Sequence, residues 1–221
     1  MTPLDLLGDV DGIVFDVGET LVDETRMWTA WAHEVGVSPL TVMGVLGGVI
    51  ERGEDHRRVW EILGTDRPRG AVTLEPRDLY PDAVECLRAA REASLRVGIA
   101  GNQPAGVVEE LRGLGFDADF ICSSAAWGVA KPSPGFFDRV LDTAGLVAGR
   151  VLYVGDRLDN DVLPARERGM RTAFLRRGPW GHLHARHAAV DLADLRLASL
   201  SDLTAMLRAG RGREDVTPPR M

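Results

Sequence analysis

Five charged residues in this sequence stand just after short apolar runs or in the loops beyond them, and together they could act on an anionic substrate. They are Asp16, Lys131, Asp156, Asp159 and Asp161. A carboxylate that follows an apolar run is a candidate nucleophile, a candidate metal ligand or an N-cap for the next helix. Position alone leaves these alternatives open, so the elements that carry the residues must decide among them.

Asp16 ends the clearest of these runs. Residues 13–15, Ile-Val-Phe, form an unbroken apolar triplet, which is typical of a strand buried on both faces of a parallel sheet, and Gly18 marks the turn that follows. In an open α/β sheet, ligands bind at the carboxyl ends of the strands. Asp16 is therefore expected at the ligand-binding edge of a sheet.

Four further apolar runs alternate with helical patterns. Strands are expected at residues 97–100, 120–122, 151–154 and 172–175, and helices from about residue 83 and at 106–113, 135–144 and 162–168. A short strand and a terminal helix are expected between residues 195 and 207. Strands joined by helices force right-handed crossovers and a mainly parallel sheet. The sequence therefore predicts an α/β fold, a doubly wound parallel sheet between two helical layers.

The segment between the first two strands has a helical pattern instead. Apolar residues recur at helical spacing from Thr25 to about Gly64, and Ser38-Pro39 has the N-cap and first-turn proline of a helix start. An insert of ~45 to 55 residues is too long for a simple loop, so we expect a small helical cap over the strand end. The expected division is a core of residues 1–21 and 76–210, a helical cap of residues 22–75 and a flexible tail of residues 211–221.

The charged residues should meet at one edge of this sheet, because the carboxyl ends of parallel strands lie together. Asp16 and Asp156 would give Mg²⁺ the carboxylate oxygens that it prefers. Lys131 would then hold a phosphoryl oxygen and restrain Asp16. The alternative for the acidic cluster is helix capping and solvation, but the coincidence of three strand ends favours a common site.

Lys131 also stands out by composition. Of the 26 basic residues, 25 are arginine and Lys131 is the one lysine. An ammonium is a compact point charge, whereas a guanidinium is a planar fork. A lysine kept in so arginine-rich a chain indicates a place that needs the compact charge, although one lysine could also persist by chance.

The overall composition excludes several classes of protein. With 221 residues, 45% of them hydrophobic and 27% charged, the chain fits an ordinary globular protein. We find no apolar run long enough for a membrane span and no signal peptide, so we expect a cytoplasmic monomer or homodimer. The net charge of −7 argues against nucleic-acid or membrane partners. Cys86 and Cys122 lie in apolar segments and are expected to be buried thiols.

Four motifs in chain order resemble those of the haloacid dehalogenase superfamily of aspartate-nucleophile hydrolases. They are Phe-Asp16-Val-Gly-Glu-Thr20-Leu, Gly101-Asn102 after a strand, Lys131-Pro-Ser-Pro, and Val-Gly155-Asp156 followed by Asn160-Asp161. The resemblance covers roughly residues 10–205 and includes a helical cap after the first motif. It implies a Rossmann-like core that hydrolyses a small phosphorylated metabolite with the aid of Mg²⁺.

The resemblance also implies roles for individual residues. Asp16 would attack phosphorus, form an aspartyl-phosphate and be regenerated by water, with Lys131 as the second catalytic residue. The implied metal ligands are Asp16, the backbone carbonyl of Gly18, Asp156 and Asp161, the last in contact with the metal only indirectly. The implied phosphate-binding residues are Thr20, Gly101, Asn102 and Lys131.

Two positions depart from the family pattern. Family phosphatases usually carry a second aspartate, a general acid and base, where this chain has Gly18, and a serine or threonine where it has Gly101. General acid–base catalysis contributes about 10² to 10⁴ in rate, so poor leaving groups should react slowly here. Glu19 is a candidate substitute for the missing acid.

These departures leave two alternatives to a phosphatase. One is an impaired or non-catalytic binding or regulatory protein of the same fold. The other, which the Gly155-Asp156 motif argues against, is a 2-haloacid dehalogenase, whose aspartate attacks carbon without a metal. Two local patterns are expected to lie outside the site: Asp9-Val-Asp11-Gly12 as a turn, and residues 182–187, which contain three histidines, as a solvated loop.

Overall fold

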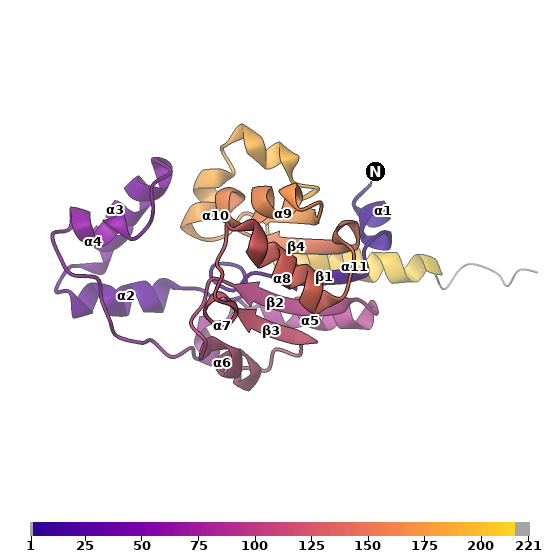
Figure 1. Ribbon diagram of the computed structural model, residues 1–221, viewed down its shortest axis with the longest axis horizontal. Helices are drawn as coiled ribbons and strands as arrows, with labels where there is room; N and C mark the ends of the chain where they lie inside the picture. Colours follow the sequence, from indigo (N-terminus) through magenta and orange to yellow (C-terminus); the bar gives the residue numbers. More distant parts are fainter. Residues whose placement is uncertain (1, 215–221) are drawn as a thin grey trace, which may run out of the picture.

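The computed structural model describes residues 2–214, with side chains for residues 2–210, and is built around a six-stranded parallel sheet (Figure 1). The strands are β1 (Gly12–Phe15), β2 (Arg96–Gly101), β3 (Phe120–Ser123), β4 (Val151–Gly155), β5 (Arg171–Leu175) and β6 (Leu195–Leu197). Their order across the sheet is β3-β2-β1-β4-β5-β6. The predicted doubly wound parallel sheet is confirmed.

Strand β1 lies at the centre of the sheet because both of its faces are apolar. Ile13 and Phe15 pack into the core on one face, and Val14 packs into a second core on the other. All four residues of β1 are buried. Phe15 lies opposite Ile99 of β2 and Val154 of β4, so the residues that follow these three strands lie close together.

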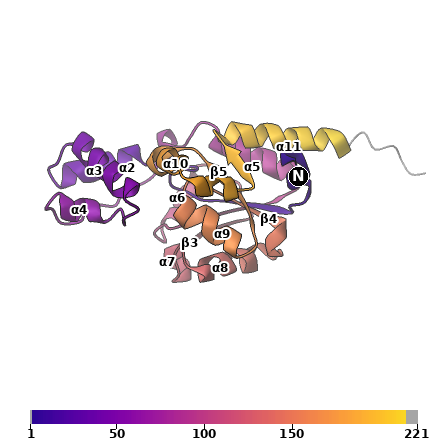
Figure 2. The ribbon, with the colours of Figure 1, turned by 90° about the horizontal axis from the view of Figure 1, so that it is seen from above.

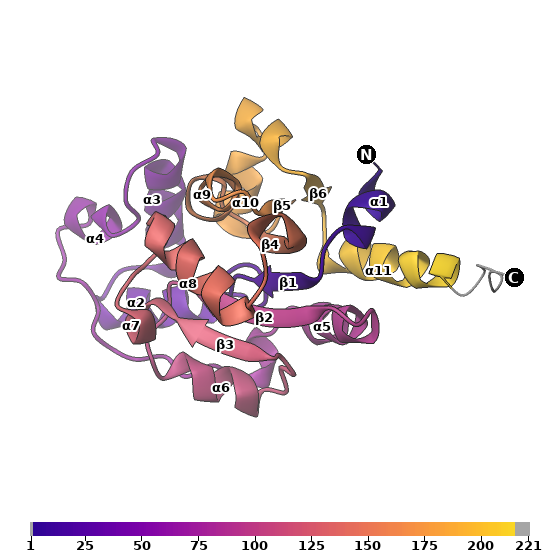
Figure 3. The ribbon, with the colours of Figure 1, turned by 45° about the vertical axis from the view of Figure 1, so that its right-hand side comes forward.

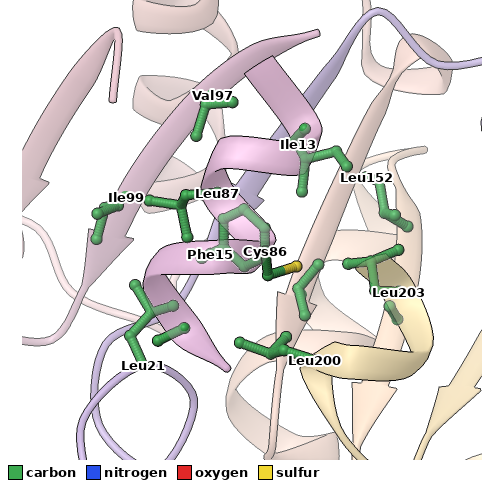
Figure 4. Close-up of a cluster of buried hydrophobic side chains, with 14 of the residues drawn as sticks. Ile13, Phe15, Leu21, Cys86, Leu87, Val97, Ile99, Leu152, Leu200 and Leu203 are labelled. Atoms are coloured by element: carbon green, nitrogen blue, oxygen red, sulfur yellow. The ribbon is translucent and has the colours of Figure 1, made fainter. Parts of the chain in front are cut away.

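Helices cover both faces of the sheet in the layers that Figure 2 shows edge-on. One face carries α1 (Pro3–Gly8), α5 (Ala83–Glu92), α6 (Val107–Gly113) and α11 (Leu200–Glu214). The other carries α7 (Ser124–Trp127), α8 (Pro134–Ala144) and α9 (Leu163–Glu167). Figure 4 shows the first of these cores, where α5 and α11 bring Leu87 and Leu203 towards Phe15.

The cysteines are unpaired within the described residues. Cys86 is buried and Cys122 is only half-buried, so the expectation of two buried thiols holds fully for Cys86 alone. Burial raises the pKa of both thiols, to about 12 at Cys86.

The segment between β1 and β2 forms a helical insert, α2 (Thr25–Glu34), α3 (Pro39–Glu51) and α4 (Arg58–Ile62), followed by a short 3₁₀ turn, η1 (Pro76–Asp78). Figures 1 and 3 show it beyond one end of the sheet, on the side away from α1 and α11. Helix α3 begins at Pro39, as the sequence predicts. The insert has a hydrophobic cluster of its own, in which Trp28 and Trp60 stack with ring centroids 5.9 Å apart.

One arginine fastens the two ends of the insert to each other. Arg26, in the first turn of α2, donates from Nε to Asp78 Oδ1 at 2.8 Å and from a terminal nitrogen to the carbonyl of Thr73 at 2.5 Å. Asp78 also accepts from the Glu75 N–H at 2.8 Å. The outgoing and returning connections of the insert are therefore held side by side.

Several helices differ from the sequence-based expectations. Residues 3–8 form α1, which was not predicted. Residues 182–187, expected as a solvated loop, begin within helix α10 (Gly178–His184). The helix expected at 162–168 starts earlier, as a π-helical turn η3 (Leu158–Val162) that leads into α9. Residues 211–214 continue α11 instead of starting the predicted tail, and residues 215–221 lie outside the described part.

Two further 3₁₀ turns, η2 (Ala148–Arg150) and η4 (Ala188–Leu192), complete the described elements. Within residues 2–214, no single helix has the length and apolar composition to cross a membrane, although α2 and α3, bent by 113° at their junction, pass that test as a pair.

Candidate active site

Asp16 is fixed in place by the sheet and by the turn that follows it. Its N–H donates to the carbonyl of Val154 at 2.9 Å, which extends the β1–β4 pairing by one residue. The N–H groups of Leu21 and Val22 then donate to the carbonyl of Val17, at 2.9 and 3.0 Å. The chain therefore turns sharply just beyond Asp16, whose buried carboxylate lies at the carboxyl end of the sheet.

Lys131 lies between two of the predicted carboxylates. Its Nζ is 2.6 Å from Asp16 Oδ1 and 2.5 Å from Asp161 Oδ1, and its side chain is 1% exposed. The rings of Phe136 and Tyr153 face the ammonium with centroids 5.9 and 5.6 Å away. Burial alone would lower the pKa of Lys131, but Asp16 and Asp161 raise it well above its ordinary value. The two carboxylates therefore favour the charged form of Lys131.

Asn102 holds the loop that carries Lys131. Its side-chain Nδ2 donates to the Lys131 carbonyl at 2.9 Å, and its Oδ1 accepts from the Lys131 N–H at 2.8 Å. Both ends of the amide are thus used to join the end of β2 to the Lys131 loop. The side chain of this predicted phosphate-binding residue positions the cation.

The predicted metal ligands include a group of three buried carboxylates. Oxygens of Asp16, Asp156 and Asp161 lie within 4.8 Å of one another. Asp156 Oδ2 is buried and has no hydrogen-bond partner among residues 2–214. Burial, followed by the charges of Asp161 and Asp16, raises the pKa of Asp156 well above its ordinary value.

The pKa of Asp161 is raised in the same way as that of Asp156. Burial raises its pKa to about 6, with Lys131 opposing the shift and Asp16 adding to it. A divalent cation would relieve the repulsion among these three buried carboxylates and would bind the Asp156 oxygen that has no hydrogen-bond partner among the described residues. A set of donors made up of oxygen atoms suits Mg²⁺. The residues present therefore fit this metal. Asp159, the remaining member of the acidic cluster, is turned away and pairs with Arg157.

Thr20 and Gly101 lie on the same side of the sheet as the nucleophile. The Thr20 hydroxyl is buried and has no hydrogen-bond partner within the described chain. At Gly101 a Cβ atom would come within 2.5 Å of Asp16 Oδ1, so a side chain there would press directly on the nucleophile. Gly18 lies in the turn just beyond Asp16, where it forms an isolated bridge with Val22.

Arg157 is a site residue that the sequence analysis missed. Its guanidinium binds Asp159 through two hydrogen bonds of 3.1 and 2.7 Å and lies 4.8 Å from the ring centre of Trp180 in α10. The charges of Asp159, Asp161 and Asp156 raise its pKa against the effect of burial. An arginine directly after a motif aspartate was the available signal.

Glu24 is the second residue that the sequence analysis missed. A Cβ atom built on Gly18 would lie 2.2 Å from Glu24 Oε1, so the Glu24 carboxyl occupies the space above Gly18. Burial, with added repulsion from Glu19 and Asp16, raises the pKa of Glu24 to about 8. No sequence spacing points to this contact, because a loop conformation creates it.

Glu19, the expected substitute acid, is turned into the protein. Its Oε1 accepts from the Glu24 N–H at 2.9 Å and its Oε2 accepts from the Tyr80 hydroxyl at 2.6 Å. Its backbone has a φ of 52°, in the left-handed region. Burial raises the pKa of Glu19, although both hydrogen bonds oppose the shift. The side chain stabilises the turn that presents Glu24.

Comparisons with known proteins bear on this site. The model of a family described as haloacid dehalogenase-like hydrolase matches residues 10–169. A glyceraldehyde 3-phosphate phosphatase of Methanopyrus kandleri is 30% identical, and one of Methanocaldococcus jannaschii is 25% identical. Each alignment covers 90% of this chain and 97% of the relative.

Solved structures agree on the fold. A phosphatase from Thermococcus onnurineus superposes with a TM-score of 0.59 at 20% identity, and an L-2-haloacid dehalogenase from Xanthobacter autotrophicus with a TM-score of 0.67 at 21% identity. Both cover 90% of this chain and are themselves covered over 98%. At such identities the likeness shows the fold and does not separate the two activities.

Proposed function

The chain belongs to the haloacid dehalogenase-like hydrolases, and on that basis we propose that it is a Mg²⁺-dependent phosphatase of small phosphorylated metabolites. The observation that carries the proposal is the position of Lys131. Its ammonium lies between the carboxylates of Asp16 and Asp161, which form a group of three close carboxylates with Asp156. In this arrangement a candidate nucleophile, a buried cation and a set of hard oxygen ligands are direct neighbours. Relatives named as glyceraldehyde 3-phosphate phosphatases support the substrate class.

The first step is attack by a carboxylate oxygen of Asp16 on phosphorus. A P–O bond forms to Asp16 while the P–O bond to the leaving group breaks, and its electron pair leaves with that oxygen. Lys131 orients Asp16 through Oδ1 and places its positive charge where a phosphoryl oxygen would lie. Water then attacks phosphorus in the aspartyl-phosphate, which releases phosphate and restores Asp16.

The metal would be held by Asp16, Asp156 and the backbone carbonyl of Gly18, with Asp161 close by, and would supply positive charge to the transferring phosphoryl group. The Thr20 hydroxyl would donate to a phosphoryl oxygen. At Gly101 and Asn102 the donors would be backbone N–H groups, because Gly101 has no side chain and the Asn102 amide is bound to the Lys131 backbone.

The dehalogenase alternative has less support. The phosphatase relatives are 25% and 30% identical over 90% of this chain, whereas the solved dehalogenase is 21% identical and shows the fold alone. An aspartate that attacks carbon without a metal would not require the buried, unpartnered oxygen of Asp156. The non-catalytic alternative depends on Gly18 and Gly101, and an activity measurement decides it.

The deciding experiment is hydrolysis of p-nitrophenyl phosphate with Mg²⁺, with EDTA, and by Asp16→Asn as the matched control. We expect turnover that needs both Mg²⁺ and Asp16. The same preparations are then given glyceraldehyde 3-phosphate, a panel of other phosphorylated metabolites, and 2-chloropropionate. Halide release without metal would favour the dehalogenase, and no turnover of any substrate would favour the non-catalytic alternative.

A further inference from the structure

The phosphatase proposed above lacks an obvious source for one proton. When the P–O bond of an alkyl phosphate breaks, the oxygen departs as an alkoxide unless an acid protonates it, and an alkoxide is a poor leaving group. Residue 18 follows the nucleophile by two positions, but it is glycine and offers no side chain. Another group beside the nucleophile turn must therefore supply the proton if alkyl phosphates are substrates.

The carboxyls around Asp16 can be sorted by what already binds them. Asp161 accepts from Lys131 Nζ and from the Arg157 N–H, and Asp156 belongs to the metal-binding group. Both oxygens of Glu19 accept hydrogen bonds, one from the Glu24 N–H and one from the Tyr80 hydroxyl. Among the described residues, it is the Glu24 carboxyl that lies against Gly18.

The Glu24 carboxyl lies where a side chain of residue 18 would begin. Its Oε1 is 2.2 Å from the position of a Cβ on Gly18, closer than any two such atoms can approach. Glycine at position 18 and glutamate at position 24 are therefore complementary, since each leaves room for the other. The backbone of Gly18 is not in the left-handed region, so its φ angle would admit a side chain, and the group that this side chain would meet is the Glu24 carboxyl.

Two hydrogen bonds of the Glu24 backbone fix it at the start of α2. The Glu24 N–H donates to Glu19 Oε1 at 2.9 Å, and the Trp28 N–H donates to the Glu24 carbonyl at 3.0 Å. Trp28 is buried in the cluster of the helical insert, and Glu24 itself is the N-cap residue of α2. The first residues of the insert therefore carry this carboxyl, whereas residue 18 belongs to the turn after the strand.

We propose that Glu24 is the general acid and base of this phosphatase, in the place that a side chain at Gly18 would otherwise fill. In the first step the Glu24 carboxyl gives its proton to the leaving-group oxygen as the P–O bond breaks. In the second step the resulting carboxylate takes a proton from the water that attacks the aspartyl-phosphate. The sum is ester plus water giving alcohol plus phosphate, and Glu24 ends protonated as it began.

The proposal rests on the phosphatase function and is tested by the dependence of rate on the leaving group. We compare p-nitrophenyl phosphate, whose leaving group hardly needs an acid, with an alkyl phosphate such as glycerol 3-phosphate. Glu24→Gln keeps the size of the side chain but cannot donate the proton. It should lower kcat on the alkyl ester by about 10² to 10⁴ and on the aryl ester by less than about tenfold.

A relocated carboxyl gives the converse test. Gly18→Asp combined with Glu24→Ala moves the carboxyl to residue 18 and removes the group that it would strike. This double variant should recover at least about tenfold in alkyl kcat over Glu24→Ala alone. Glu61→Gln, which alters an exposed carboxyl of α4 in the same insert, should leave the ratio of aryl to alkyl rates as in the wild type. Unfolding midpoints of all variants exclude a general loss of structure.

Two results would overturn the role of Glu24 while leaving the phosphatase intact. One is an unchanged ratio of aryl to alkyl rates in Glu24→Gln. The other is a loss in Glu24→Gln that is equal for both esters and is reversed by raising Mg²⁺, which would make Glu24 a metal ligand. A wild-type protein that hydrolyses neither ester would overturn both this proposal and the phosphatase itself.

Discussion

The charged cluster at the strand ends and the aromatic cluster of the insert hold their residues in place by different forces. The strand-end cluster, defined as Asp16, Lys131, Asp156 and Asp161, is a set of buried charges fixed at hydrogen-bond distances. Its geometry is set by the register of β1 with β4 and by the Asn102 bridge. A small displacement of any member leaves a charge buried without its partner, which is costly.

The insert cluster consists of rings in van der Waals contact. Trp28 stacks on Trp60, and Trp31 meets both edge-on at centroid distances of 5.4 and 6.5 Å. Trp180, from α10 of the core, joins the cluster through the His56 ring at 5.9 Å. Apolar contact tolerates small shifts. The comparison teaches that changes at the strand ends should act on the chemistry in an all-or-none manner, whereas changes in the insert should be graded.

The largest effect is expected from Asp16→Asn. The change keeps the size of the side chain and removes the nucleophile, so turnover of p-nitrophenyl phosphate should fall by about 10⁴-fold or more. The circular dichroism spectrum should be unchanged, because the substitution also removes one of three crowded negative charges. Wild-type turnover in a preparation free of contaminating phosphatase would rule out the assigned role.

Replacing Lys131 tests whether the strand-end cluster needs a point charge. Lys131→Met leaves Asp16 and Asp161 without their cation, which should destabilise the fold by about 3 to 5 kcal/mol and stop turnover. Lys131→Arg should fail nearly as badly, because a planar guanidinium does not fit between two carboxylates and two rings. Urea unfolding and p-nitrophenyl phosphate kinetics measure both effects. An arginine variant with full activity would show that only the sign of the charge matters.

Asp156→Ala separates metal binding from folding. In the wild type, Mg²⁺ at about 100 times its Kd should stabilise the native state by about 2.7 kcal/mol, which thermal unfolding reports without any substrate. The variant should lose this response and need far more Mg²⁺ for turnover, while its metal-free form unfolds at a similar or higher temperature because a crowded charge is gone. A Mg²⁺-induced shift as large in the variant as in the wild type would place the metal elsewhere.

The smallest effect is expected when the pH is lowered, and it should be a loss of stability in the helical insert. Burial lowers the pKa of His56 from 6.5 to about 4; Asp55 opposes the shift, and Arg157, Arg57 and Arg67 add to it. A neutral ring in the native state stabilises the protein above about pH 6.5, where the unfolded chain is neutral too, and this contribution is lost as the pH falls towards 4.

Tryptophan fluorescence should report this loosening, because the His56 ring lies beside Trp28 and Trp180. His56→Gln cannot be protonated and should show a flatter response between pH 7 and pH 4. If the variant and the wild type follow the same curve, the acid sensitivity belongs to other groups.

The sequence predicted those parts of the molecule that local patterns determine. The apolar run before Asp16 and the run before Asp156 fix two strands, and pairing of Phe15 with Val154 then brings the two aspartates together. The family and the sheet are confirmed on that basis. The assigned roles of Asp16, Lys131 and the metal ligands remain predictions, although the side chains of Asp16, Lys131, Asp156 and Asp161 lie close together.

Long-range contacts explain what could not be predicted. Gly178-Pro-Trp180 has the composition of a loop, but the burial of Trp180 against the insert stabilises a helix there. Glu19 was the closer carboxyl in sequence, yet its left-handed backbone turns it towards Tyr80. Glu24 lies over Gly18 only because the turn reverses between them, and no spacing rule encodes that geometry.

The central claim, that the strand-end cluster carries out phosphoryl transfer through Asp16, is tested most directly by trapping the intermediate. The wild-type protein with Mg²⁺ is mixed with a substrate that carries a labelled phosphoryl group, quenched in acid within one turnover and digested for mass spectrometry. The account predicts a labelled, hydroxylamine-sensitive acyl phosphate on the peptide that contains Asp16, and none in Asp16→Asn. Continued turnover with no label on the protein, or with label on another residue, would contradict it.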